Sequence, residues 1–542
     1  MGIPSYFRKL THSYKLVQHS RPSTTVDWLL FDFNCLIYHV LRRPDCPQYT
    51  PDAPKAWEEK FLNEIARYTL KVIKKVEPQK GVFIAVDGVV PMAKIRQQRM
   101  RRFKVGGIRS AHPPHTPLCD VEAGGLEAGG VGAGGAGTGG LGGTCSPQWD
   151  KNAITPGTEF MQALADRLHA FASTHSKPGG LQIQVSDSNT PGEGEQKLMQ
   201  LLRASAAPGN DSIVMYGLDA DLIVLSLWNR ATLFPNRPMY LFREHVERGE
   251  IERDAIGEEF FIWFDINALD QAIRKELGDE SIHGLQDYCA AMMLLGNDFL
   301  PTSMSFRLKE EGHQRLVQLL KASGQQLWSE ANGLNAAAMQ PILEQLAAEE
   351  EQRFGRAVFK KLSARGDDNE PEDEPLRQRA DEVFTQPHDI RRLRPNWRTI
   401  YNNLAFGSCR ATPLKAARTY IQGLSWVVDY YTGKDISMEW VYNWHFPPQW
   451  SDILRAFRDG GWVEPPKAGV RQLQPVEQLG MVLPLSSWSL IPSGAEIKHL
   501  PEVAPEWFPT AFHMNSVGKR YAWECEPDIP IPTPAQVWAR LA

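Results

Sequence analysis

The fold of this chain is decided by an apolar stretch, VDWLLFD at residues 26–32, which has the length and composition of a buried strand and ends in an acid. Three further stretches repeat this arrangement: GVFIAVD at 81–87, LQIQVSD at 181–187 and SIVMYGLDAD at 212–221. Patterns typical of helices, at 56–75 and 160–173, lie between these runs. Strands that alternate with helices predict an α/β fold with a largely parallel sheet.

The acids that close these runs are expected to meet at one edge of the sheet, because ligands of such folds bind beyond the carboxyl ends of the strands. Two short motifs, TPGEGEQKLM at 190–199 and LLGNDFLP at 294–301, add further acids. We expect one acidic centre of seven residues: Asp32, Asp87, Glu193, Glu195, Asp219, Asp221 and Asp298.

Seven carboxylates in one place repel one another unless cations lie among them. Because all the expected ligands are oxygen donors, the sequence predicts hard ions, Mg²⁺ or Mn²⁺, bound by these catalytic acids. Two such ions suit in-line phosphodiester cleavage, so phosphoryl hydrolysis is the expected chemistry. Any one of these acids alone is more often a strand-end cap or a turn residue, but the set of seven favours a metal site.

A run of cations follows Asp87 in the segment PMAKIRQQRMRRFKVGGIR at 91–109, which contains no acid, although the whole chain has a net charge of −5. We interpret this segment as the local polyanion site. On a helix its spacing places four donors on one face: Lys94, Gln98, Arg101 and Arg102. Ammonium, amide and guanidinium groups together suit a terminal phosphate. A solvated helix face and a nuclear-localisation tract are the alternatives for this segment.

The length of 542 residues indicates more than one packed unit, and 42% hydrophobic with 23% charged residues is an ordinary globular composition. Two stretches of unusual amino-acid composition divide the chain. The Gly-rich run at 119–146 is expected to be a flexible insertion, and it lacks the GxxxxGK[ST] pattern of a phosphate-binding loop. The acidic, proline-bearing run at 366–390 is expected to be a solvated linker.

These divisions predict a first domain made of residues 1–118 and 147–365. A second region, 391–542, contains ten of the 16 Trp residues and is expected to pack on the first domain as an aromatic-rich unit.

The seven cysteines stand singly, at 35, 46, 119, 145, 289, 409 and 525, which argues against a structural zinc site and against a disulfide scaffold. The N-terminus has no secretory pattern, and no apolar run reaches the roughly 18 to 20 residues that span a bilayer. We therefore expect an intracellular protein, cytoplasmic or nuclear, without a membrane segment.

Several motifs together resemble those of the 5′→3′ exoribonuclease (XRN) family. They are the five acidic motifs in this order, the basic segment AKIRQQRMRRFK, the N-terminal MGIPSYFRKL, WDKNAITPGTEFM at 149–161, PVEQLGMVLP at 475–484 and GKRYAWE at 518–524. The resemblance runs from end to end and is broken only by the two biased stretches. The chain looks like the catalytic core of this family with little added.

The resemblance implies a Rossmann-like 5′-nuclease (PIN-like) domain that depends on Mg²⁺, with two ions. It implies 5′→3′ hydrolysis of single-stranded RNA with a 5′-monophosphate to mononucleotides, so this RNA is the expected partner. By position, the seven acids match the family's acidic centre, and Lys94, Gln98, Arg101 and Arg102 match its phosphate pocket.

The sequence departs from the family at two aromatic positions. The family has a His six residues after its first Asp, where it stacks on the leading base; here Tyr38 takes this place, and His39 follows it. Tyr38 is expected to stack in the same way, because aromatic faces accept any base. In ISMEWVYNWHFPP at 436–448, Met438 replaces a family Trp. The aromatic residues that remain there have core packing as their alternative interpretation.

Two other functions fit part of this pattern. A structure-specific 5′-flap DNase of the same superfamily also has an acidic metal cluster beside basic helices, but it does not explain GTEFM or PVEQLGMVLP. A non-catalytic scaffold that binds the 5′-phosphate of RNA would be indicated by the loss of acids, and none of the seven is missing.

Overall fold

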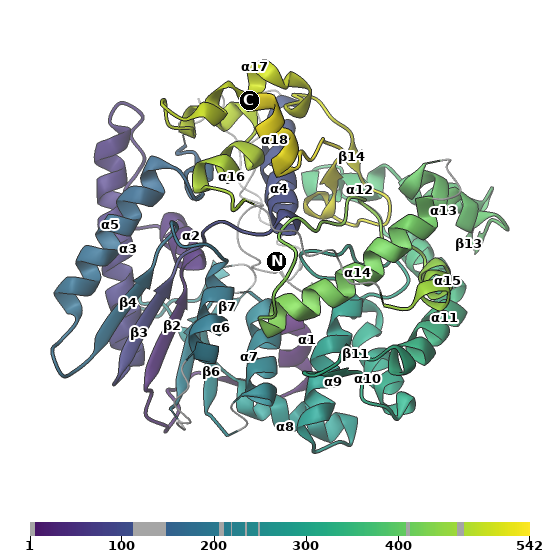
Figure 1. Cartoon of the computed structure of the whole chain (residues 1–542), viewed down its shortest axis with the longest axis horizontal. Coiled ribbons are helices and arrows are strands. Elements are labelled where there is room, and N and C mark those ends of the chain that lie inside the picture. The colour runs from purple at the N-terminus through teal and green to yellow at the C-terminus, as the bar shows by residue number, and fades with distance from the viewer. Residues whose placement is uncertain are drawn as a thin grey trace.

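The computed structural model describes residues 6–111, 148–204, 211–217, 219–233, 236–247, 250–407, 412–462 and 471–542. The Gly-rich insertion expected at 119–146 lies outside these residues. Figure 1 shows a twisted sheet, with helices α3 and α5 beside it, on one side of the molecule and a group of helices on the other.

Seven strands form the main sheet in the order β1-β9-β6-β5-β2-β3-β4. The five strands from β6 to β4 run parallel, whereas β9 runs antiparallel to both of its neighbours, β6 and β1. This confirms the predicted mixed α/β class with a largely parallel sheet. The strands are β1 (Val17–Gln18), β2 (Trp28–Asp32), β3 (Gly81–Ala85), β4 (Gln182–Ser186), β5 (Ile213–Tyr216), β6 (Met239–Glu244) and β9 (Phe261–Asp265).

Side chains of the buried strands alternate between two hydrophobic cores, as the two-residue period of a strand requires. In β2, Leu29 and Phe31 belong to the core under helices α2, α3 and α5, whereas Leu30 belongs to the core under α7, α8 and α9. Both faces of the sheet are therefore covered, which explains why the strand sequences are almost continuously apolar.

The helices of the first half are α1 (Tyr6–Ser13), α2 (Phe33–Arg42), α3 (Pro54–Val76), α4 (Met92–Ala111), α5 (Glu159–His175), α6 (Gly194–Ala204), α7 (Asp221–Thr232), α8 (Ile266–Leu277) and α9 (Ile282–Met292). Those that follow are α10 (Gly312–Ser323), α11 (Ala336–Ser363), α12 (Glu374–Arg377), α13 (Trp397–Phe406), α14 (Thr412–Thr432), α15 (Trp450–Gly460), α16 (Pro475–Val482), α17 (Leu500–Val503) and α18 (Pro534–Leu541). Four two-stranded ladders complete the described elements: β7 (Val246–Glu247) with β8 (Glu250–Ile251), β10 (Trp328–Ser329) with β11 (Gly333–Leu334), β12 (Thr385–Gln386) with β13 (Asp389–Leu393), and β14 (Met514–Asn515) with β15 (Glu526–Pro527).

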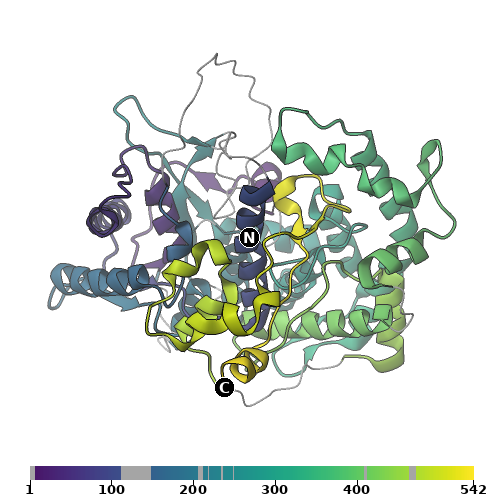
Figure 2. The same ribbon diagram turned by 90° about the horizontal axis from the view of Figure 1, so that it is seen from above.

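The C-terminal region shares its core with the sheet. Trp426 and Tyr431 of α14 and Trp450 of α15 belong to the same buried cluster as Met215 of β5 and Leu285 of α9. Helix α4 connects the two halves from another side, because its Met92, Ile95 and Phe103 pack, together with Val90, in a cluster whose other members lie beyond residue 440. Figure 2 shows α4 between the sheet and the helical half, with the C-terminal segments beside it.

The segment expected to be a solvated linker, 366–390, is solvated only over its first part. Residues 367–371 are exposed, as their acidic composition predicts. Beyond them, Leu376 is buried, Phe384 is part of a core cluster, and the carboxylate of Asp381 accepts hydrogen bonds from the backbone N–H of Gly518. Apolar and partnered residues in the second half therefore fix this segment against the C-terminal region.

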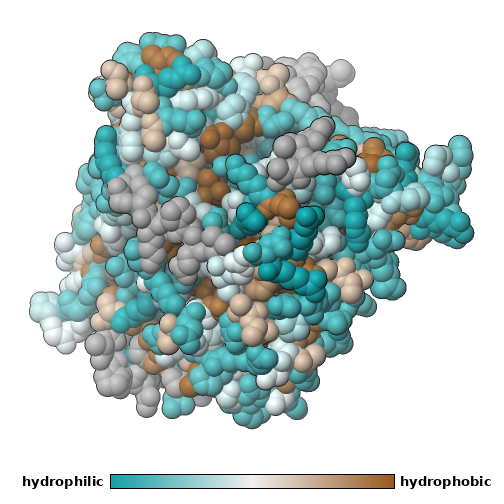
Figure 3. Space-filling model, turned by 45° about the vertical axis from the view of Figure 1, so that its right-hand side comes forward, coloured by the Kyte–Doolittle hydropathy of each residue, from teal (hydrophilic) through white to brown (hydrophobic). Residues whose placement is uncertain are grey.

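The surface seen in Figure 3 is mostly hydrophilic, and its hydrophobic residues form separate patches. Across the described ranges, we find no helix with both the length and the apolar character needed to cross a membrane.

Candidate active site

The expected acidic residues come from the carboxyl edge of the sheet and from the segments that follow it. Asp32 is the last residue of β2, Asp87 comes two residues after β3, and Asp221 is the first residue of α7. Glu193 and Glu195 lie at the start of α6, and Asp298 follows a short 3-10 helix at Met293–Leu295. The predicted strand-end acids therefore reach one edge, as the parallel topology requires.

Asp32 and Asp87 face the same point at the start of α6. A Cβ atom at Gly194 would lie 2.5 Å from Asp32 Oδ1 and 3.4 Å from Asp87 Oδ1, so only glycine allows this close approach. The backbone N–H of Gly194 donates to Asp87 Oδ1 at 2.7 Å. Asn34 donates from Nδ2 to Asp87 Oδ2 at 2.9 Å and accepts from the Asp87 backbone N–H through its own Oδ1. Asp87 is thus held by backbone and side-chain donors.

Lys94 lies among the acids. Its ammonium is 2.6 Å from Glu193 Oε2 and 2.7 Å from Asp298 Oδ2. The basic helix expected to hold a phosphate therefore supplies a cation to the acidic centre as well. This double contact links α4, the start of α6 and the segment after α9, although sequence positions 94 and 298 are far apart.

Burial and the repulsion between neighbouring carboxylates shift the pKa values of the acids in this centre. Burial, followed by the charges of Asp87 and Asp219, raises the pKa of Asp32 well above its ordinary value. Burial and the charge of Asp298 raise the pKa of Asp221 to about 7.

Two other acids differ in the direction of their pKa shifts. Burial and the charge of Asp221 raise the pKa of Glu195. Burial would raise the pKa of Asp298 too, but the ammonium of Lys94 holds it below its ordinary value. Protons and one lysine therefore partly compensate the clustered negative charge.

The residues present fit a hard divalent cation in their chemistry. As the side chains are placed, no three acidic, His or Cys residues within the described ranges converge closely enough to hold a metal ion. Two features of the centre explain this spacing. Carboxylates of like charge repel one another, and the Lys94 ammonium lies between Glu193 and Asp298. Asp221 Oδ1 is buried without a hydrogen-bond partner, which leaves an oxygen ligand with free lone pairs. An oxygen-only donor set with an unpartnered buried oxygen matches Mg²⁺ or Mn²⁺.

Helix α4 carries the expected phosphate donors, but they differ in accessibility. Arg102 is buried and donates from Nη2 to Thr155 Oγ1 at 2.8 Å and from Nη1 to Gln98 Oε1 at 3.3 Å. Arg101 is partly exposed. Thr155, in the segment AITPGTEF, was not expected as a contact of this pocket.

Two other cations of this segment do not belong to a polyanion site, which corrects the expectation that the whole basic run forms one. Arg96 is held by the Trp444 carbonyl oxygen and by Glu526, and Arg99 is buried against the C-terminal region. The helical period turns these two residues away from the Lys94 face.

Asp187 also departs from the pattern of strand-end acids. Its Oδ2 lies 2.9 Å from His169 Nε2, and its Oδ1 accepts from the Asn189 backbone N–H. The acid at the end of β4 therefore closes a loop and pairs with α5, because β4 is the edge strand on that side of the sheet.

Of the two aromatic residues on α2, Tyr38 is partly exposed and His39 is buried. The ring of His39 lies 4.8 Å from that of Tyr68, and its Nε2 is 3.4 Å from Glu259 Oε1. A stacking role is therefore open to Tyr38 and closed to His39.

The aromatic segment after α14 is largely core. Trp440 stacks on Trp426 with ring centroids 5.1 Å apart, and the buried Tyr442 hydroxyl donates to the Phe446 carbonyl oxygen. Met438 is 42% exposed, and its carbonyl oxygen accepts from the backbone N–H of Met92 at the start of α4.

Sequence reasoning missed Tyr430, which contacts the acidic centre from the C-terminal region. The Tyr430 hydroxyl of α14 donates to Glu193 Oε1 at 2.6 Å, and both side chains are buried. No local pattern indicated this contact, because the two residues are 237 positions apart and Tyr430 lies in an apolar helix.

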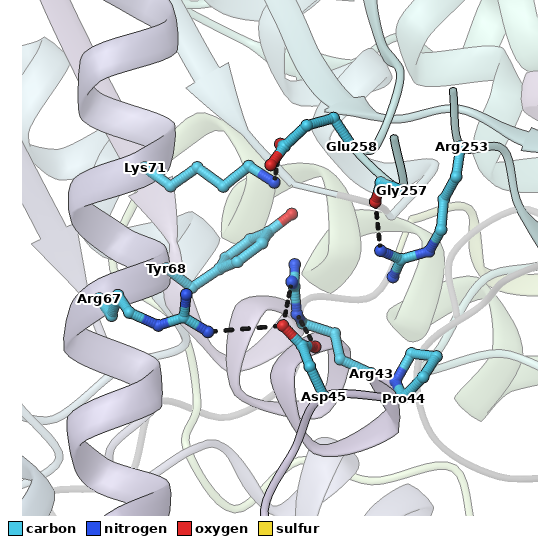
Figure 4. Close-up of a pocket in the computed structure, with 9 residues that line it drawn as sticks. All are labelled: Arg43, Pro44, Asp45, Arg67, Tyr68, Lys71, Arg253, Gly257 and Glu258. Atoms are coloured by element: carbon cyan, nitrogen blue, oxygen red, sulfur yellow. Dashed lines mark hydrogen bonds and ion pairs between the residues drawn. The ribbon is translucent and has the colours of Figure 1, made fainter. Parts of the chain in front are cut away.

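A separate polar pocket of about 370 Å³ is lined by residues that follow α2, by α3 and by the segment before β9 (Figure 4). Arg43 pairs there with Asp45 and with the buried Glu259, and Lys71 pairs with Glu258. Because carboxylates match these cations, the pocket has no excess positive charge with which to bind an anion.

The comparisons with known proteins agree with this architecture. Residues 1–244, which contain six of the seven strands of the main sheet, match the family model described as XRN 5'-3' exonuclease N-terminus. Residues 410–531 match the model described as Xrn1 helical domain. The chain belongs to the XRN 5'-3' exonuclease family.

Named relatives extend the likeness over most of the chain. The 5'-3' exoribonuclease 1 of Homo sapiens is 26% identical over 98% of this chain and 33% of its own length. The 5'-3' exoribonuclease 2 of Candida albicans is 29% identical over 65% of this chain and 40% of its own length. The 5'-3' exoribonuclease 2 of Gallus gallus is 24% identical over 97% of this chain and 68% of its own length.

This chain therefore spans less than half the length of the first two relatives. A solved structure, the catalytic core of Rad2 in complex with DNA substrate, matches 79% of this chain at 14% identity. Its TM-score of 0.30 is too low to establish a common fold.

Proposed function

We propose that this chain hydrolyses single-stranded RNA from its 5′ end to mononucleotides and depends on two Mg²⁺ or Mn²⁺ ions. The observation that supports it best is the position of Lys94, which pairs with Glu193 and Asp298 and belongs to the donor face of α4. An acidic centre and a set of phosphate donors are thereby joined at one residue.

In this proposal the ions are held by Asp32, Asp87, Glu193, Glu195, Asp219, Asp221 and Asp298. Bound ions supply the Lewis acidity that activates the attacking water and stabilises the leaving oxygen. Asn34 and the backbone of Gly194 orient the carboxylate of Asp87. Their hydrogen bonds leave this carboxylate at the edge of the sheet, beside Asp32.

The terminal 5′-monophosphate of the RNA is assigned to Lys94, Gln98, Arg101 and Arg102. Lys94 and Gln98 lie one helical turn apart, about 6 Å along the axis, so a phosphate bound on α4 lies next to the acidic centre. Charge-assisted hydrogen bonds to one phosphate favour a monophosphate over a hydroxyl end. We expect a triphosphate or a cap to be poorly accepted, because each adds more atoms at the 5′ end than a monophosphate.

Tyr38 is assigned to stacking on the leading base, which its partial exposure on α2 supports. We assign the nuclease domain to residues 1–118 and 147–365 and the aromatic-rich region to 391–542. Since the two share a buried cluster, both are assigned to the functional enzyme.

The test compares RNAs with 5′-monophosphate, 5′-triphosphate and 5′-hydroxyl ends, together with matched DNA, in Mg²⁺ and in EDTA. We expect mononucleotides from 5′-monophosphate RNA in Mg²⁺, no product in EDTA, and no product from Asp219→Ala. Binding of RNA without cleavage by the parent protein would indicate a scaffold. Cleavage of DNA flaps in preference to RNA would indicate a flap nuclease.

A further inference from the structure

Helix α14 lies outside the sheet but contacts the acidic centre through a buried tyrosine. The Tyr430 hydroxyl donates to Glu193 Oε1 at 2.6 Å. Burial and the charge of Glu193 raise the pKa of Tyr430 well above its ordinary value.

The two oxygens of Glu193 have different partners. Tyr430 binds Oε1, whereas the Lys94 ammonium lies 2.6 Å from Oε2 and also contacts Asp298. This division fixes the plane of the carboxylate, since a quarter turn about its Cγ–Cδ bond would break both contacts. Oε2 is therefore the oxygen on the side of Lys94 and Asp298.

Tyr430 itself has little freedom to move. Its ring stacks on Trp426 with centroids 5.2 Å apart, and Phe299 meets it edge to face at 5.4 Å. Trp426 is anchored in turn, because its indole N–H donates to the Ser437 carbonyl oxygen at 2.8 Å.

The same aromatic group also supports the other acid paired with Lys94. Phe299 directly follows Asp298, and the Lys94 ammonium lies 5.8 Å from the centre of the Phe299 ring. The aromatic group of Tyr430, Trp426 and Phe299 therefore lies beside Lys94 and beside its two carboxylate partners.

We propose that Tyr430 is a positioning residue that orients Glu193 for divalent cation binding and so makes cation affinity depend on the packing of α14. A ligand that is already oriented loses less conformational freedom when a cation binds. This inference rests on the proposed metal-dependent function.

The test is Tyr430→Phe in the full chain, which removes one hydroxyl and keeps the ring. Tyr401→Phe is the matched control, because the Tyr401 hydroxyl is buried and donates at 2.7 Å to a backbone carbonyl, that of Pro447. Mn²⁺ binding is titrated by electron paramagnetic resonance without RNA, and cleavage rates are measured across Mg²⁺ concentrations.

We expect Tyr430→Phe to weaken Mn²⁺ binding about 10- to 100-fold, the usual effect of removing a residue that orients a metal ligand. The Mg²⁺ concentration for half-maximal cleavage should rise in parallel, and cleavage at saturating Mg²⁺ should recover. Tyr401→Phe should leave both titrations unchanged. Unchanged Mn²⁺ binding in Tyr430→Phe, or an equal loss in Tyr401→Phe, would overturn the inference.

The metal titration and the RNA assay separate this inference from the proposed function. If Tyr430→Phe weakens Mn²⁺ binding but the parent protein cleaves no RNA, the proposed function is wrong and the positioning role stands. If the parent cleaves RNA and Tyr430→Phe has the parental metal titration, only the positioning role is wrong. A parent protein that binds no Mn²⁺ overturns both.

Discussion

Arg99 donates from Nη1 to the backbone carbonyl oxygen of Met481 at 2.7 Å, across 382 positions of the chain. Its other guanidinium nitrogens donate to the carbonyl oxygens of Trp507 and Pro530. The side chain is buried, and burial lowers its pKa to about 9. The helix that carries the phosphate donors is therefore fixed to three segments of the C-terminal region.

Replacing Arg99 by Leu should destabilise the whole chain, because three buried carbonyl oxygens lose their donor and each costs about 1–3 kcal/mol when left unsatisfied. We expect a loss of at least about 3 kcal/mol in urea unfolding, with one cooperative transition. Arg67→Leu, at an exposed arginine of α3, serves as the control and should change stability little. A second, separate transition of the C-terminal region would contradict the shared core.

Asp32→Asn should separate activity from stability. It removes a buried charge that Asp87 and Asp219 repel, so the free energy of unfolding in EDTA should equal or exceed that of the parent protein. RNA cleavage in Mg²⁺ should fall by at least about 100-fold, because loss of a metal ligand costs more than loss of a residue that orients one. Parental cleavage rates in this variant would remove Asp32 from the metal site.

The metal-free protein should lose stability as the pH rises from about 5 to 8. The pKa of Asp221 is about 7 in the folded chain and near 3.8 in the unfolded chain, so the folded state binds more protons in this range. The stabilisation is fully present below pH 3.8 and is lost as the pH rises through 7. Urea unfolding in EDTA should show this fall, and Asp221→Asn should reduce it, while the raised pKa values of Asp32 and Glu195 leave part of it.

Divalent cations should reverse that fall, because a cation binds the ionised carboxylate. Mg²⁺ affinity should therefore increase from pH 6 to pH 8, with protons released on binding. Calorimetry in two buffers of different ionisation enthalpy measures this release. Binding without proton release would contradict the raised pKa of Asp221.

Arg101→Gln should reduce selectivity for the 5′ end. A charge-assisted hydrogen bond is worth about 1.5–3 kcal/mol, so cleavage of 5′-monophosphate RNA should fall about 10- to 100-fold. RNA with a 5′-hydroxyl should be affected little, because it makes no such bond. We choose Arg101 because Arg102 is buried against Thr155, where substitution would also disturb packing. Equal losses on both ends would mean that Arg101 contacts only the backbone.

Tyr38→Ala should weaken binding of single-stranded RNA by about 1–3 kcal/mol, the contribution of one stacked base. Tyr38→Phe should bind like the parent protein, because stacking needs the ring and not the hydroxyl. Fluorescence anisotropy with a 5′-monophosphate RNA in Ca²⁺ provides the measurement. If the alanine variant binds RNA as the parent does, Tyr38 has a packing role only.

Much of the fold and the position of the acids could be predicted from the sequence, because each depends on a pattern of residues that lie close together in the chain. A run such as VDWLLFD contains both the apolar period of a buried strand and the acid that follows it. Parallel pairing then places Asp32 and Asp87 at one edge without further information.

The basic segment at 91–109 is helical, as expected, and forms most of α4, but the partners of this helix were not predictable. The period of a helix indicates which residues share a face, and it leaves open what covers that face. Lys94 was expected to bind phosphate and is paired with two acids, and Arg99, in the segment interpreted as a polyanion site, is buried.

The sequence by itself determined the α/β class, the acidic edge and the basic helix, because each depends on residues close together in the chain. Only the tertiary structure decided that Tyr430 holds Glu193, that Thr155 holds Arg102 and that His39 turns inward. These contacts join residues that are far apart in the sequence and are brought together when the cores pack. No sequence pattern reveals the partner of a hydroxyl such as that of Tyr430, which lies in an apolar helix. The positions of the acids are determined by nearby sequence, whereas the orientation of their side chains is determined by the tertiary packing around them.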